Sequence, residues 1–241
     1  REEGFAGTAL KKDEYVGECS DIDDIIVFRQ DGTYLVTKVS DKVFVGKNVI
    51  HIDVFKRNDD RTIYNVVYQD GRAGYFMVKR FAVKSVTREK EYDLTKGTKN
   101  SRILYFTANP NGEAEIIKVH HRPKPRLKKL SFEFDFSEQA IKGRNAIGNI
   151  LTRHAVRKIQ KREDGVSTLG AIDLWYDESV RRLNTEERGA YLGAFKGDDK
   201  LLVIMDNGSY RTTGFDINTH FEDNMTHLQK FNEGQVASVV Y

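Results

Sequence analysis

The chain has 241 residues, of which 39% are hydrophobic and 31% charged, a balance typical of a folded domain rather than a disordered one. The net charge of +3 is the difference between 39 basic and 36 acidic residues, which excludes a uniformly basic chain but permits a basic face. No apolar run reaches the length of a membrane-spanning helix, so we expect no membrane partner. The single cysteine, Cys19, excludes an internal disulfide and a CxxC metal site, and it favours a reducing, cytoplasmic setting.

The ends and the length of the chain bear on its domain organisation. It begins at Arg1 rather than at methionine and ends on the apolar run 239–241, so we expect a piece of a longer polypeptide. Its length suits one β domain, and the three prolines give no sign of an internal linker. We therefore expect a single domain over residues 1–241.

Pairs of strand-like runs around tight turns follow one another along the chain. Asp31-Gly32, Asp70-Gly71, Asn109-Pro110-Asn111-Gly112 and Asn207-Gly208 each lie between β-branched and aromatic runs. Such turns predict hairpins, because Gly, Asn and Asp adopt positive φ at low steric cost. The strands that we expect these turns to join are 25–28 with 34–36, 65–68 with 75–78, 103–106 with 116–119, and 201–205 with 210–212.

The turn glycines recur at a nearly constant interval. Gly32, Gly71 and Gly112 are separated by 39 and 41 residues. A period of this length with several strands per repeat predicts an all-β, propeller-like array. Residues 131–136 alternate as a further strand, and Lys142-Gly143-Arg144 predicts a turn after it.

The sequence pattern alone does not decide the secondary structure of two segments. Residues 150–162 fit both helical spacing and strand alternation. Residues 177–190 are polar and charged, and they fit either a short helix or a hairpin loop.

Candidate catalytic or metal-ligating residues are few. His120 and His121 are adjacent, and neighbours on a strand point to opposite faces, so we expect a solvated basic loop rather than one metal site. No nucleophile elbow, phosphate-binding loop or dinucleotide fingerprint is present. Acidic pairs such as Asp23-Asp24 flank strands, where a turn role is expected. We predict a non-catalytic chain that holds no cofactor.

Local basic clusters are more informative than the net charge. Residues 118–129 contain six Lys and Arg and no acid, and two prolines hold this stretch extended. Flexible cations on a rigid β scaffold suit contacts with DNA phosphates, which carry no sequence information; any one cluster could equally be a solvated, charge-balanced face. The candidate DNA-binding residues are Lys79, Arg80, Lys84, Arg88, Lys124, Arg126, Lys128, Lys129, Lys142, Arg144, Arg153, Arg157 and Lys158.

Several stretches resemble one known family. IKGRNAIGN (141–149), followed by ILTRHAVRKI, is similar to the GR-x-x-x-G blade motif in the C-terminal domain of bacterial type II topoisomerase A subunits. TALKKDEYVGECSDIDDIIVF (8–28), YNVVYQDGRAGYFMVKRFAV (64–83) and KEYDLTKGTKNSRILYFTANPNGEAE (90–115) resemble the same domain, most closely that of the topoisomerase IV enzymes. The resemblance covers nearly the whole chain.

This resemblance implies a β-pinwheel, a disc of four-stranded blades that exchange strands, of which the chain would hold about four to five. It implies that a basic rim binds and bends double-stranded DNA for strand passage, in the cytoplasm at the nucleoid. Mg²⁺, ATP and the catalytic tyrosine would belong to other domains and to the B subunit, which would associate through the rest of the A subunit. The Gln-Arg-Arg-Gly-Gly-type box of gyrase A is absent from this sequence, which favours topoisomerase IV. A gyrase domain, a protein-interaction scaffold without a DNA role and an enzyme with a cleft in the disc are the alternatives.

Overall fold

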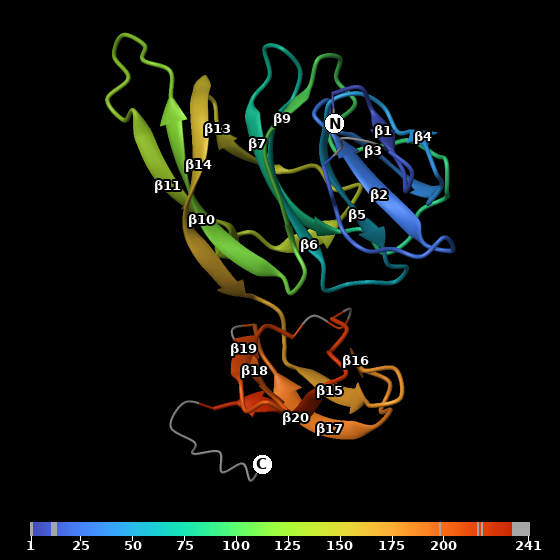
Figure 1. Cartoon of the computed structure of the whole chain (residues 1–241). Helices are drawn as coiled ribbons and strands as arrows, with labels where there is room; N and C mark the ends of the chain where they lie inside the picture. Colours follow the sequence, from blue (N-terminus) through green and yellow to red (C-terminus); the bar gives the residue numbers. More distant parts are fainter. Residues whose placement is uncertain (1, 11–13, 198, 216, 218, 233–241) are drawn as a thin grey trace. The chain divides into compact units, whose positions relative to one another are not determined.

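The computed structural model describes residues 2–10, 14–197, 199–215, 217 and 219–232. Within these residues the chain is β throughout, apart from the short 3-10 helix η1 (Phe136–Glu138). The chain divides into two compact units (Figure 1). The first comprises residues 1–109 and 114–165, and the second comprises residues 110–113 and 166–241.

The first unit contains four sheets built from β1 to β14. Their orders are β1-β4, β5-β2-β3-β8, β12-β7-β6-β9 with β13 also on β7, and β11-β10-β14. We call the last three the first, second and third sheets. The strands are β1 (Phe5–Ala6), β2 (Asp24–Arg29), β3 (Thr33–Lys38), β4 (Val43–Phe44), β5 (Val49–Phe55), β6 (Ile63–Gln69), β7 (Phe76–Ala82), β8 (Tyr92–Asp93), β9 (Arg102–Asn109), β10 (Glu113–His121), β11 (Ser131–Asp135), β12 (Ile141–Gly143), β13 (Asn149–Thr152) and β14 (Val156–Ser167).

Neighbouring sheets of the first unit exchange strands. β8 follows the β6–β7 hairpin of the second sheet, yet it pairs with β3 of the first sheet. In the same way β12 and β13 follow the β10–β11 hairpin of the third sheet, yet both pair with β7 of the second. This exchange defines a β-pinwheel, so the fold class expected from the sequence is confirmed.

Two layers of the core lie on either side of the second sheet. Tyr64, Val66 and Tyr68 of β6 pack toward the first sheet, while Val67 packs with Ile117 and Val119 toward the third. Successive side chains of a strand point to opposite faces. Because both faces of β6 and β7 are covered, nearly every residue in these strands is buried.

The second unit contains two three-stranded sheets around one core. Their orders are β16-β15-β17 and β19-β18-β20. Leu174, Phe195, Leu201 and Val203 form the centre of the shared core. The strands are β15 (Ile172–Asp177), β16 (Arg182–Asn184), β17 (Ala190–Phe195), β18 (Lys200–Met205), β19 (Tyr210–Thr213) and β20 (Met225–Phe231).

Three of the four predicted hairpins are confirmed. Asp31-Gly32 joins β2 to β3, Asp70-Gly71 lies between β6 and β7, and Asn207-Gly208 joins β18 to β19. Gly32 and Gly208 have φ of 92° and 78°, as such tight turns require.

The fourth predicted hairpin is wrong. The turn at 109–112 connects β9, which pairs with β6 in the second sheet, to β10, which pairs with β11 in the third. Gly112 therefore occupies a connection between sheets, whereas Gly32 and Gly71 lie within hairpins, and the apparent forty-residue period joins positions that are not equivalent. The turn residues predict that the chain reverses direction, but they do not predict which sheet the next strand joins.

Both ambiguous segments adopt the β alternative, as strands for residues 150–162 and as a hairpin for residues 177–190. Residues 150–162 fall in β13 and β14, and residues 177–190 contain the turn and strand β16 of a hairpin with β15.

Candidate nucleic-acid interface

The third sheet carries a long basic loop. Residues 122–130 join β10 to β11 and extend beyond the sheet (Figure 1). The Arg122 amide donates to the Ala155 carbonyl at 2.7 Å, which fastens the start of the loop to the segment before β14. The start of the loop is therefore held beside the segment that joins β13 to β14.

His121 holds the end of the same loop. Its side chain is buried, with Nδ1 2.9 Å from the Lys129 carbonyl oxygen and Nε2 3.0 Å from Thr152 Oγ1. One imidazole thus connects the loop to β13. We expected a solvated basic loop at the two histidines, and His121 instead lies in the core of this corner of the sheet. Among the described residues no group of three or more His, Cys, Asp or Glu side chains could hold a metal ion.

Exposed cations without a carboxylate partner gather around this loop. In the described part of the chain, no ion pair involves these side chains, whereas many other basic residues are paired. We call this set the third-sheet basic surface. It consists of Arg122, Lys124, Arg126, Lys128, Lys129, Arg153, Arg157 and Lys158, all of them exposed.

A hollow of about 380 Å³ lies within this surface. His120, Pro123, Leu130, Arg157 and Lys158 line it, so two cations border a partly apolar floor. The Arg153 guanidinium lies 5.3 Å from the centroid of the Tyr75 ring, which adds an exposed aromatic group. A surface with several exposed cations of this kind can contact DNA phosphates at several points.

Lys79 and Arg80 belong to the core instead. They are 3% and 1% exposed, and they lie on opposite faces of β7, both of which are covered. Lys79 Nζ donates to the carbonyls of Arg144 and Ala146 at 3.1 and 3.2 Å. Burial in this site lowers the pKa of Lys79 to about 8. This placement corrects the expectation that these two side chains face DNA.

Arg80 is part of a buried polar network between the second and third sheets. Its Nε donates to Asn65 Oδ1 at 2.9 Å, and Asn65 Nδ2 donates to Glu115 Oε2 at 2.8 Å. Thr107 Oγ1 donates to the other Glu115 oxygen at 2.5 Å. A buried charge needs such partners, because it loses its hydration.

Lys84 and Arg88 are exposed, but each has an acidic partner. Lys84 Nζ lies 3.5 Å from Asp60, and Arg88 Nε lies 2.8 Å from Asp24. Both pairs are solvent-exposed on the cation side and cost little to separate. These residues can contribute to a basic surface only by giving up those partners.

Lys142 and Arg144 differ although they flank one glycine. Lys142 is exposed on β12, whereas Arg144 is half-buried. The Arg144 guanidinium lies 4.3 Å from the centroid of the Tyr92 ring and donates to the Tyr34 hydroxyl at 3.4 Å. A hydrogen bond from Thr87 and the nearby Arg144 lower the pKa of Tyr92 to about 8. Arg144 therefore links the segment after β12 to the first sheet.

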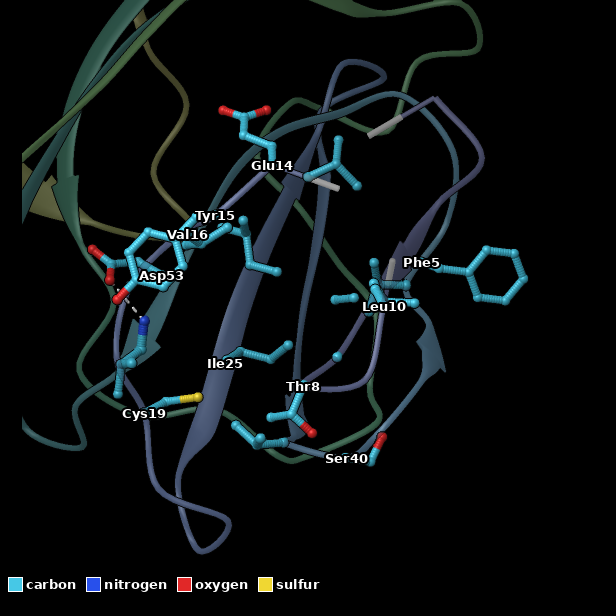
Figure 2. A pocket seen from close by; sticks show the side chains of 18 of the residues that line it. Phe5, Thr8, Leu10, Glu14, Tyr15, Val16, Cys19, Ile25, Ser40 and Asp53 are labelled. Atoms are coloured by element: carbon cyan, nitrogen blue, oxygen red, sulfur yellow. Dashed lines mark hydrogen bonds between the residues drawn. The ribbon is translucent and has the colours of Figure 1, made fainter. Parts of the chain in front are cut away.

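A larger cavity than the hollow in the third-sheet basic surface lies elsewhere, over the other face of the first sheet. It measures about 690 Å³, and its lining includes the apolar side chains of Ile25, Val39 and Val49. Tyr15 and Cys19 lie along the segment that borders it (Figure 2). Among the described residues, its ionisable lining side chains are the acids Glu14, Glu18 and Asp53, the phenol of Tyr15 and the thiol of Cys19. Carboxylates in this lining disfavour phosphate, which distinguishes the cavity from the third-sheet basic surface. No helix among the described residues is long and apolar enough to cross a membrane.

Strand-exchanged sheets with a basic loop define a β-pinwheel with a candidate polyanion-binding surface. The chain belongs to the family of topoisomerase C-terminal domains from Bacteroidota, whose model matches residues 1–163 and 182–241. The family resemblance seen in the sequence is thus confirmed.

Individual proteins and solved structures are also similar to this chain. The chain is 26% identical over 164 residues to the A subunit of DNA topoisomerase 4 from Borreliella burgdorferi, covering 66% of this chain and 24% of that protein. It thus spans about a quarter of that relative's length. Among solved structures, the C-terminal domain of DNA topoisomerase IV matches with a TM-score of 0.40 and 14% identity, over 84% of this chain and 72% of that one. The DNA gyrase A C-terminal domain matches with a TM-score of 0.32 and 12% identity, over 96% and 93%.

Proposed function

We propose that this chain binds duplex DNA through the phosphate backbone and bends it for a type II topoisomerase of the topoisomerase IV kind. The observation that carries the proposal is the third-sheet basic surface, in which eight exposed cations have no acidic partner among the described residues. Phosphate contacts of this kind give affinity without base readout, which suits an enzyme that acts at many sequences.

In this proposal, other domains and the B subunit carry out DNA cleavage and ATP hydrolysis. The DNA would be presented to a cleavage gate in the rest of the A subunit, while ATP and Mg²⁺ would act there and in the B subunit. The similarity to a relative named as a topoisomerase 4 supports this kind of enzyme over gyrase, as does the absence of a Gln-Arg-Arg-Gly-Gly box from the sequence. A scaffold without a DNA role remains an outcome of the test below.

The test is a salt titration of duplex affinity. Backbone-driven binding predicts that log K falls linearly with log salt, with a slope of about −0.9 for each phosphate neutralised. A variant with Lys124, Arg126, Lys128 and Lys129 all changed to Ala should lose affinity for every sequence alike and have a shallower slope. Wild-type protein that does not bind, or binds with a flat salt dependence, would contradict the proposal and support the scaffold.

A matched control separates local contacts from net charge. Lys38, Lys42, Lys47 and Lys99 are exposed residues outside the third-sheet basic surface. Changing these four to Ala removes the same charge and should reduce affinity much less. Equal losses from both variants would mean that the loop residues contribute only through the overall field.

A further inference from the structure

The two units carry opposite net charges, which the value of +3 for the whole chain conceals. The first unit contains 32 Lys and Arg against 23 Asp and Glu, a net charge of +9. The second contains seven against 13, a net charge of −6. A duplex carries about one negative charge per 1.7 Å of its axis, so the two units present it with opposite long-range fields.

Local pairing occupies most of the cations that the second unit could offer to phosphates. In the second unit Arg211 Nη2 lies 2.7 Å from Glu222, and Lys230 Nζ lies 2.6 Å from Asp199. Arg181 and Arg188 pair with Asp223 and Glu186. Four of the seven cations of this unit are thus neutralised internally, whereas the third-sheet basic surface of the first unit has no such pairs among the described residues.

Unpaired acids also face solvent in the second unit. Glu178, Glu187 and Asp206 are exposed, and no ion pair involves them within the described residues. Bringing phosphates near these carboxylates would be repulsive, and it would give no counterion release in return.

We propose that the negative charge of the second unit keeps it off the duplex, so that DNA contact is confined to the first unit. This inference rests on the proposed DNA binding and adds where the contact ends. Both units have a β scaffold of the same general kind. In this proposal the charge of each unit, rather than its fold, therefore sets the length of duplex that the chain contacts.

Tethered DNA cleavage in the full chain tests this directly. Cys19, the single cysteine, is changed to Ser, and one new cysteine carrying an iron chelate is placed at Gln160, Thr185 or Tyr210, all of which are exposed. Gln160 lies on β14 and lines the hollow in the third-sheet basic surface, whereas Thr185 and Tyr210 belong to the second unit. We expect strong cleavage of a long duplex from Q160C and none above background from T185C or Y210C.

A second experiment reverses the charge of three exposed acids in the second unit. Glu178→Lys, Glu187→Lys and Asp206→Lys together should produce cleavage from the second-unit tags and make the salt slope steeper by about one for each phosphate gained. The control is Glu2→Lys, Glu14→Lys and Glu18→Lys, which changes the net charge by the same amount but in the first unit. It should raise affinity without producing cleavage from T185C or Y210C.

The outcomes separate this inference from the proposed function. Wild-type protein that binds DNA and is cut from T185C or Y210C as strongly as from Q160C would overturn the inference alone. So would a reversal variant with no new cleavage, because charge would then not be what excludes the second unit. Absence of salt-dependent binding by the wild type would overturn the proposed function, and the inference with it.

Discussion

Arg80 and Glu115 are opposite charges buried on neighbouring sheets, with Asn65 hydrogen-bonded to both. Removing one partner from such a network leaves the other charge without compensation, which is more costly than the network's net contribution suggests. The strand 76–82 reads FMVKRFA, and apolar residues on both sides of the two cations were the available sign that both faces are covered. At Lys79 and Arg80, basic character alone was therefore a poor guide to exposure.

Replacing Arg80 with Met should lower the free energy of unfolding by about 3–5 kcal/mol, because Glu115 would keep its charge in the core without the guanidinium. The control Arg157→Met changes an exposed side chain on β14 and should stay within about 0.5 kcal/mol of wild type. Urea denaturation measures both. Equal midpoints for Arg80→Met and wild type would contradict the role assigned to the network.

The lowered pKa of Lys79 predicts that the free energy of unfolding rises at alkaline pH. Its folded pKa is about 8, against 10.5 for a free lysine, because burial disfavours the charged form. Between these two values the unfolded chain binds a proton that the folded chain has lost, so the free energy of unfolding increases with pH by up to about 1.4 kcal/mol per unit. Below pH 8 this group adds no pH dependence.

The measurement is urea unfolding of wild type and Lys79→Met at several pH values from 7 upward. The other titrating groups are common to both proteins, so the difference between them isolates Lys79. We expect the difference to change across the window between the two pKa values. A constant difference would mean that Lys79 keeps its ordinary pKa in the folded state.

At the scale of elements, the loop 122–130 depends on contacts that its own sequence does not contain. Arg122 is hydrogen-bonded to Ala155, which lies between β13 and β14, and His121 connects the loop to Thr152 at the end of β13. The basic composition and the two prolines indicated an extended cationic segment. Which strands it would lie against depended on the pairing of β10 with β14 and of β13 with β7.

Changing His121 to Ala should release this loop while leaving the sheets folded. Amide hydrogen exchange across 122–130 should become faster, and duplex affinity should fall several-fold because ordering the cations would then cost conformational entropy. His120→Ala is the matched control, since His120 makes neither of these two loop contacts. Faster exchange with unchanged affinity would separate loop order from DNA binding.

For the whole molecule, strand exchange makes the three main sheets of the first unit depend on one another. Gly148 shows how closely the exchanged segment approaches: a Cβ at this position would lie 2.6 Å from the Val78 carbonyl oxygen. The glycine of the blade motif is required by this contact between backbones.

Gly148→Ala should therefore destabilise the first unit by about 1–3 kcal/mol, because the backbone of β13 or β7 must shift. Trp175 is the single tryptophan and lies in β15 of the second unit, so its fluorescence reports that unit selectively. We expect the circular dichroism transition to move to lower urea while the fluorescence midpoint stays in place. A Gly143→Ala control, where a Cβ meets nothing within 4 Å, should have little effect.

The sequence by itself determined the strand-forming runs, three of the hairpins, the basic character of residues 118–129 and the family. These features depend on local turn chemistry, alternation and composition, which a single chain displays directly. Only the tertiary structure decided that the turn at 109–112 crosses between sheets, that Lys79 and Arg80 are buried, and that Arg144 contacts two tyrosines. Each of these depends on which strands pair across long separations in sequence, and a strand's own residues do not specify its partner.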